Sequence, residues 1–255
     1  MKLLSWALLA LAPALIDATE LGYSTTTPST VNGSLSFGSH YAVLNLDLIT
    51  ALVGSINTTT KGQAFIKSTG KWINAVHRQN PPPISIFSRI YFSTSLMPEV
   101  SLSAPFYQDV AEVGNLTESD ELSQLYPAFK PLPNYDVVLQ KTRYYAGTDN
   151  TLVQILRNQK IDTVVLVYHV IPFKMSHSWG MSGLRTSGVM LTTALALFDL
   201  DFNVYVIANN TIETGDDATS INNVILQSIL PKMPLNVITV EQAIDALSRS
   251  NATYY

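Results

Sequence analysis

Three groups with complementary chemistry stand where predicted strands end. Asp47 follows an apolar stretch that begins at Tyr41, and Lys141 lies at the end of another that begins at Tyr135. A Gly-bracketed turn at Gly183–Val189 comes after a further apolar stretch and opens onto a helical segment. In a parallel sheet, ligands bind outside the carboxyl ends of the strands. The sequence therefore predicts that a carboxylate, an ammonium group and a helix N-terminus converge on one crevice.

Each of these groups also has a plain structural interpretation. An acid at a strand end, such as Asp47, is often a cap or a loop carboxylate, and a strand-end lysine such as Lys141 is usually solvated. Thr186 or Ser187 could simply cap the helix that follows. The combination of these groups and their order along the chain favour a functional site.

The elements that must position these groups alternate between strands and helices. This alternation predicts a three-layer αβα sandwich with a mainly parallel six-stranded sheet. The region Ser95–Pro133 has no clear period, and we expect it to cover one end of the sheet as loop and short helix. Strands are expected at 41–48, 84–91, 135–142, 161–166, 204–208 and 236–240, and helices at 61–80, 151–159, 188–198, 216–230 and 241–248.

The order of these groups resembles the isochorismatase-like (cysteine hydrolase) superfamily. That family carries Gly-x-x-Thr-x-x-Cys after its fourth strand, and Gly183, Thr186 and Ser187 match its turn. Two further segments resemble family segments: KTRYYAGTDNTLVQIL and PEVS. A third, GLRTSGV followed by FDLDF, resembles a secreted fungal-type subgroup that carries Val in the cysteine position. The resemblance spans roughly 41–240 and implies an isochorismatase-like, Rossmann-like fold.

The resemblance implies a catalytic triad that this chain does not complete. The family's triad is an Asp after the first strand, a Lys after the third and a Cys after the fourth. Asp47 and Lys141 match the first two, but Val189 occupies the position of the Cys, and the chain has no cysteine at all. Valine cannot attack a carbonyl, so the acyl-enzyme route is closed. The hydroxyls of Thr186 and Ser187 have no evident histidine base to activate them.

What the resemblance leaves in place is electrostatic and acid–base chemistry. The backbone N–H groups of Arg185 and Val189 would form the family's oxyanion hole. Asp47 could transfer a proton, and Lys141 could hold its charge or bind an anionic substrate. True isochorismatases, which work without cysteine, suggest an Asp acting as general acid on a vinyl ether before water attacks. The resemblance also implies a cis peptide at Leu184–Arg185.

The sequence predicts neither a metal site nor a cofactor. The family's nicotinamidase-type metal site needs an Asp and His cluster after the second strand, and Phe92–Pro98 contains no histidine. The four His residues are scattered along the chain. The stretch Val167–Met181 interrupts what the family makes a direct strand-to-Gly connection, and we expect residues 167–181 to form an insertion loop outside the core. A misread exon boundary is the alternative origin of this stretch.

The N-terminal sequence is typical of a secretory signal peptide. A lysine at the second position is followed by the apolar run Leu3–Ile16 and a small residue at a plausible cleavage point. The alternative is an apolar N-terminal helix of the mature fold. We therefore expect a signal peptide at 1–18, an arm at 19–40 and an isochorismatase-like domain at 41–255.

Glycosylation sequons agree with secretion. Each Asn-x-Ser/Thr sequon is weak evidence alone, but together with the signal they favour an extracellular glycoprotein. A secreted chain without cysteine has no disulfides, so packing must stabilise it. The sequons stand at Asn32, Asn57, Asn115, Asn209 and Asn251.

Composition limits the partners. With 255 residues, the chain can bury a large core in one domain. A net charge of −4 without a basic cluster argues against nucleic acid. No apolar run beyond the signal is long enough to span a membrane, so no membrane anchor is expected after signal cleavage. Because family members often associate, a homo-oligomer is also considered.

Two functions from different classes remain open. The first is a secreted hydrolase that uses Asp47 and Lys141, without a covalent intermediate, on a small molecule such as isochorismate. The second is a catalytically inactive pseudoenzyme that binds a small ligand or a protein partner. Retention of Asp47 and Lys141 together favours the hydrolase. Loss of the nucleophile at Val189 and the stretch beside the site favour the pseudoenzyme.

Overall fold

A single parallel sheet forms the centre of the molecule. The computed structural model describes residues 35–111, 116–168, 186–213 and 216–253. Within these residues, six strands pair in the order β3-β2-β1-β4-β5-β6, and every pair is parallel. The strands are β1 (Tyr41–Leu46), β2 (Ile84–Ile90), β3 (Val137–Lys141), β4 (Thr163–Tyr168), β5 (Asn203–Ile207) and β6 (Asn236–Ile238). The predicted six-stranded α/β sandwich is confirmed.

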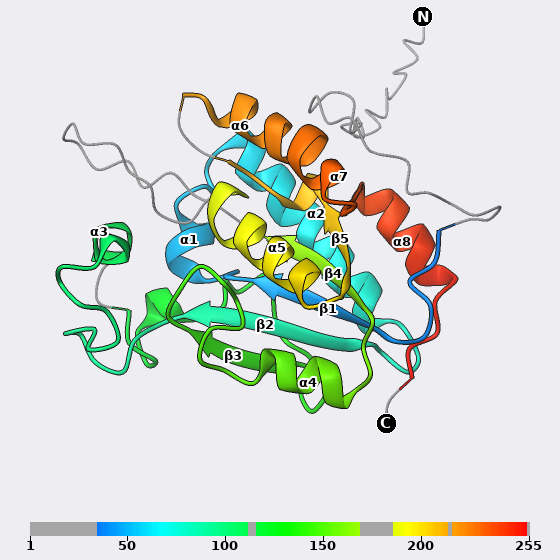
Figure 1. Cartoon of the computed structure of the whole chain (residues 1–255), viewed down its shortest axis with the longest axis horizontal. Coiled ribbons are helices and arrows are strands. Elements are labelled where there is room, and N and C mark those ends of the chain that lie inside the picture. The colour runs from blue at the N-terminus through cyan, green and yellow to red at the C-terminus, as the bar shows by residue number, and fades with distance from the viewer. Residues whose placement is uncertain (1–34, 112–115, 169–185, 214–215, 254–255) are drawn as a thin grey trace, which may run out of the picture.

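Helices flank both faces of the sheet, as parallel crossovers require. In Figure 1, α5 lies in front of the sheet and α2 behind it, while α8 packs against α2. The α-helices are α1 (Thr50–Gly54), α2 (Thr60–His77), α3 (Pro105–Ala111), α4 (Leu152–Asn158), α5 (Leu191–Asp199), α6 (Ala218–Val224), α7 (Leu230–Lys232) and α8 (Val240–Ser248). Shorter or wider turns are η1 (Glu121–Ser123), η2 (Thr186–Met190), η3 (Ala208–Asn210) and η4 (Ile225–Ile229).

The two central strands are buried along their whole length. Every residue of β1 and of β4 is buried, which explains why both segments are continuous apolar runs rather than alternating ones. Their register places Leu46 opposite Tyr168. Strand β4 therefore includes Val167 and Tyr168, the first two residues of the expected excursion Val167–Met181. This corrects the predicted end of the strand, because pairing with β1 extends β4 by two residues. The rest of that stretch, 169–181, lies outside the described residues.

Helix α2 has clear start and stop signals. The Thr59 side chain accepts a hydrogen bond from the Gly62 N–H at 3.0 Å and so caps the first turn. The apolar face packs into the core through Phe65 and Trp72, both almost fully buried. The helix ends before the prolines that begin at Pro81, which cannot continue it.

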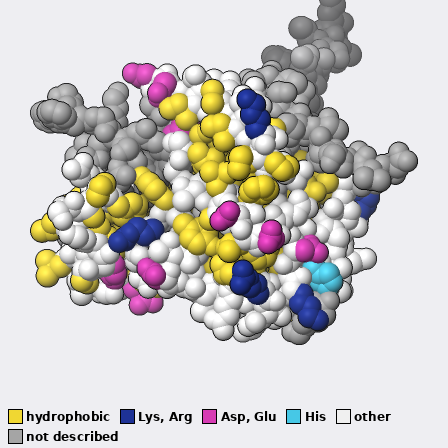
Figure 2. Space-filling model, viewed as in Figure 1, with side chains coloured by type: hydrophobic (Ala, Val, Ile, Leu, Met, Phe, Trp, Pro, Cys, Tyr) yellow, Lys and Arg dark blue, Asp and Glu magenta, His cyan; other side chains and the backbone are white. Residues whose placement is uncertain are grey.

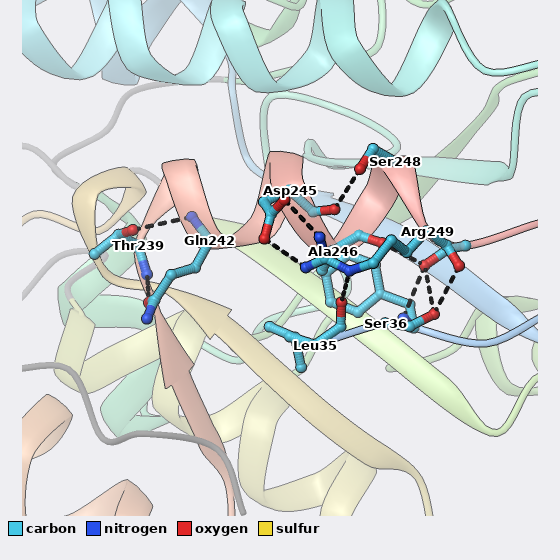
Figure 3. A network of polar contacts seen from close by, with 10 residues as sticks. Leu35, Ser36, Thr239, Gln242, Asp245, Ala246, Ser248 and Arg249 are labelled. Carbon is cyan, nitrogen blue, oxygen red and sulfur yellow. Dashed lines mark hydrogen bonds and ion pairs between the residues drawn. The ribbon is translucent and has the colours of Figure 1, made fainter. Parts of the chain in front are cut away.

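Helix α8 is the last helix of the fold, and its C-terminal end contacts the chain segment that begins at Leu35 (Figure 3). Thr239 and Gln242 form a capping box at its start. At its end, the Arg249 guanidinium pairs with Asp245 and donates to the Leu35 carbonyl at 2.9 Å. These contacts join two segments that are more than 200 residues apart in the sequence.

The distribution of surface charge and the hydropathy of the helices concern two predicted absences, nucleic-acid binding and a membrane anchor. On the face drawn in Figure 2, Lys and Arg side chains are scattered among acidic and apolar ones rather than gathered into a basic patch. In the part of the chain that the structure describes, no helix is both long and apolar enough to cross a membrane.

Candidate functional site

Asp47 turns out of β1 in a left-handed conformation. Its φ of 48° is rare for a residue other than glycine, although Asp and Asn tolerate it best. Ser88, on the neighbouring β2, holds the residue from two sides. The Asp47 N–H donates to the Ser88 carbonyl at 3.1 Å, and the Ser88 hydroxyl donates to Asp47 Oδ1, also at 3.1 Å. Such outliers cluster at functional sites, where the surrounding structure maintains them.

Lys141 reaches Asp47 across an intervening strand. Lys141 pairs in register with Ile90 of β2, so its long side chain must extend over β2 to arrive at the end of β1. Its ammonium lies 2.7 Å from Asp47 Oδ2, and both side chains are 0% exposed. The ammonium also donates to the Arg143 carbonyl at 2.8 Å. The structure thus brings together two predicted site residues that lie 94 positions apart in the sequence (141 − 47).

Burial perturbs both members of this ion pair. Loss of solvation raises the pKa of the Asp47 carboxyl above its usual value, and the Lys141 charge and the Ser88 hydroxyl only partly oppose this. Loss of solvation lowers the pKa of the Lys141 ammonium, and Asp47 partly opposes that shift. Both shifts favour the neutral forms, which are the forms needed for a general acid and an amine base.

The predicted turn begins α5 beside the segment that follows Lys141. Val189, which the sequence analysis expects at the position of the family's cysteine, is fully buried within η2. A Cβ added to Gly188 would touch the Tyr144 ring at 3.4 Å, so this glycine allows close approach. The Ala146 N–H donates to Thr193 Oγ1 of α5 at 3.1 Å. Arg185 and the Leu184–Arg185 peptide lie outside the described residues.

A carboxylate that the sequence analysis missed occupies the start of this turn. Glu213, which follows η3, is almost fully buried and accepts a hydrogen bond from the Ser187 N–H at 2.9 Å. The neighbouring Thr186 hydroxyl is fully buried and has no hydrogen-bond partner among the described residues. One of the turn's N–H groups is therefore occupied by the protein itself.

Tyr168 is the second residue that the sequence analysis missed. It ends β4 opposite Leu46, one residue before Asp47, and it is fully buried. Burial first, and then the charges of Asp47 and Glu213, raise the pKa of its phenol well above the usual range. The signal was the unbroken run IDTVVLVY, which continues two residues past the predicted strand end.

Other predicted residues lie apart from this site. Asn57 and Asn209 are half-buried, and Asn251 is exposed near the chain's end. Asn32 and Asn115 lie outside the described residues. Within the described ranges, no group of three or more His, Cys, Asp or Glu side chains is arranged to hold a metal ion.

Comparison with known proteins identifies the relatives of this chain. The Isochorismatase domain family model matches residues 41–167, which include Asp47 and Lys141. No curated protein sequence matches the chain significantly.

Solved structures share the fold at low identity. An isochorismatase family protein from Burkholderia thailandensis is 22% identical, with a TM-score of 0.64, over 85% of this chain and 100% of that one. A cysteine hydrolase from Pseudomonas syringae pv. phaseolicola is 15% identical, with a TM-score of 0.66, over 86% and 99%. N-carbamoylsarcosine amidase from Thermoplasma acidophilum is 16% identical, with a TM-score of 0.56, over 79% and 96%. Together with the family model, this shared fold places the chain in the isochorismatase-like superfamily.

Proposed function

We propose that the chain is a hydrolase that acts on a small molecule through Asp47 and Lys141, without a covalent intermediate. The observation that carries this proposal is the fully buried ion pair between Asp47 and Lys141 at 2.7 Å. The expectation that Val189 stands in the position of the family's cysteine supports a route without a covalent intermediate. A buried ion pair is costly to maintain and adds little stability, so structural need is a weak reason for it. Vinyl ethers such as isochorismate are the substrate class that needs no nucleophilic side chain.

Acid-catalysed hydrolysis of a vinyl ether suits these two residues. The Asp47 carboxyl would protonate the terminal alkene carbon, so that a C–H bond forms and the π bond breaks to leave an oxocarbenium ion. Water then adds to this ion and returns a proton to the Asp47 carboxylate. The resulting hemiketal separates into an alcohol and a ketone. Burial raises the pKa of the Asp47 carboxyl, and a raised pKa favours the protonated form that this step uses.

Replacing Asp47 with Asn tests this function. Asn is nearly isosteric and tolerates the left-handed backbone at this position, so the fold should remain intact. We expect turnover of isochorismate to fall by about 100-fold or more, the usual contribution of a general acid. Asp245→Asn, at an exposed surface position, is the matched control and should keep full activity. Sustained turnover by Asp47→Asn, or a covalent intermediate trapped on a serine or threonine, would contradict the mechanism.

The second candidate is a pseudoenzyme that binds a small ligand or a protein partner. Val189 in the expected position of the family's cysteine favours it, because a valine cannot form an acyl-enzyme. The Ser187 N–H, in the same turn, already donates to Glu213 and is not free for a ligand. A thermal-shift screen with isochorismate, nicotinamide and small amides separates the two candidates. Stabilisation of the native state without turnover of any vinyl ether, amide or ester would support the pseudoenzyme.

We also propose that the protein is secreted and glycosylated. The support is the apolar N-terminal segment, with a signal peptide at 1–18, and the sequons. A homo-oligomer also stays a prediction, which sedimentation of the purified protein tests.

A further inference from the structure

The Tyr168 hydroxyl is a buried polar group that the fold leaves unused. Its side chain is 0% exposed, and among the described residues the hydroxyl has no hydrogen-bond partner. An unsatisfied buried donor is unfavourable, and phenylalanine would fill almost the same volume without that penalty. The hydroxyl therefore needs a partner that the described residues do not supply.

The position of Tyr168 places this hydroxyl in the candidate site. Tyr168 is the last residue of β4 and lies opposite Leu46, the residue before Asp47. The carboxylates of Asp47 and Glu213 contribute to the raised pKa of its phenol, after burial. Ligands bind at this carboxyl edge in parallel sheets. A protonated phenol there can donate a hydrogen bond to an acceptor atom of a ligand.

The neighbouring turn has lost part of its capacity to bind an oxygen atom. The Ser187 N–H, at the start of the turn, already donates to the Glu213 carboxylate at 2.9 Å. A ligand oxygen cannot take this N–H without displacing a buried carboxylate. Side chains around Asp47 are an alternative source of hydrogen bonds to a ligand oxygen.

We propose that Tyr168 is a substrate-binding residue whose phenol donates a hydrogen bond to an oxygen of the ligand held beside Asp47 and Lys141. This inference rests on the proposed function, because it assumes that the ion pair marks the ligand site. The ligand class is a small molecule with a carbonyl, carboxylate or ether oxygen. Lys141 donates to Asp47 and to the Arg143 carbonyl, and an ammonium has a third N–H that can point to the same oxygen.

The test compares Tyr168→Phe with wild type for three probes: isochorismate, nicotinamide and acetamide. We expect at least one probe to raise the melting temperature of the wild type, and Tyr168→Phe to weaken its Kd about 10-fold, as loss of one hydrogen bond to a ligand should. The melting temperature of unliganded Tyr168→Phe should equal or exceed that of wild type, because no internal partner is lost. A drop of several degrees would reveal an internal partner and overturn the inference.

Tyr145→Phe is the matched control. Its hydroxyl is also buried without a partner among the described residues, but the charge that acts on it is that of Arg157 in α4, outside the site. Tyr145→Phe should bind the probe like wild type. Equal probe affinity in wild type and Tyr168→Phe defeats this inference alone. Binding without turnover, weakened by Tyr168→Phe, defeats only the hydrolase. No binding of any probe to wild type defeats both.

Discussion

The Asp47–Lys141 pair sets the energetics of the site at the scale of single residues. Two charges that are fully removed from water lose more solvation energy than their attraction restores unless the geometry is very favourable. The pKa of Asp47 is raised and that of Lys141 is lowered, because for each group the loss of solvation outweighs the attraction of its partner. Stability is therefore a weak reason for this pair, and measurements of the free energy of unfolding can test that.

A double-mutant cycle on the pair should show non-additive stability. Lys141→Met alone should lower the free energy of unfolding by about 3–5 kcal/mol, because it leaves a buried carboxylate without its partner. Asp47→Asn combined with Lys141→Met should be neutral or stabilising by up to about 4 kcal/mol. Urea unfolding of the four proteins measures this cycle. Additive effects in the double variant would show that the two side chains have no coupling energy and would contradict this expectation.

The same pair predicts how stability depends on pH. The pKa of Asp47 is raised in the folded state, so the folded protein keeps the carboxyl proton at pH values where the unfolded chain has lost it. Stability therefore falls as the pH rises from about 3.8, the pKa of Asp in the unfolded chain, to the raised pKa of the folded state. The pKa of Lys141 is lowered in the folded state. Stability therefore rises as the pH increases from that lowered pKa to about 10.5, the pKa of lysine in the unfolded chain. Relative to the double variant, wild type should therefore be least stable near neutral pH. Urea unfolding at about pH 4, 7 and 10 checks this, and a flat difference would contradict it.

At the scale of elements, helix α2 contains two glycines with opposite expected responses. A Cβ at Gly62 would lie 2.0 Å from the Ile56 carbonyl oxygen, whereas nothing lies within 4 Å of one at Gly70. Gly62→Ala should destabilise the protein by about 1–3 kcal/mol through overpacking. Gly70→Ala should stabilise it by up to about 1 kcal/mol through helix propensity. Thermal unfolding compares the two, and equal effects would mean that the first turn of α2 is not packed as described.

At the scale of the whole molecule, exposure separates the sequons. Asn251 is exposed, whereas Asn209 is half-buried and its Oδ1 accepts the Val240 N–H at 3.1 Å, at the start of α8. We expect the secreted protein to begin near Thr19 and to carry a glycan at Asn251 but not at Asn209. N-terminal sequencing and the mass change of Asn251→Gln after deglycosylation test this. An intact Met1 start without a mass loss would contradict it.

Much of the fold follows from local sequence patterns. Continuous apolar runs identify β1 and β4, and their alternation with helical segments predicts a parallel sheet. That topology brings strand ends together, so the proximity of Asp47 and Lys141 can be predicted from order alone. The predicted end of β1 at Leu48 was two residues too long, because Asp47 adopts a left-handed conformation and the strand ends at Leu46.

The sequence by itself determined the family, the alternation of elements, and the presence of an acid and a lysine at strand ends without a cysteine beside them. Only the tertiary structure decided how far the strands extend, because pairing with a neighbouring strand, and not local preference, ends β4 at Tyr168. It alone decided that Glu213 accepts a hydrogen bond from the Ser187 N–H, since that contact joins residues 26 positions apart on either side of α5 and β5. The burial that perturbs Asp47 and Lys141 is likewise a property of the packed molecule, because desolvation depends on every element around them.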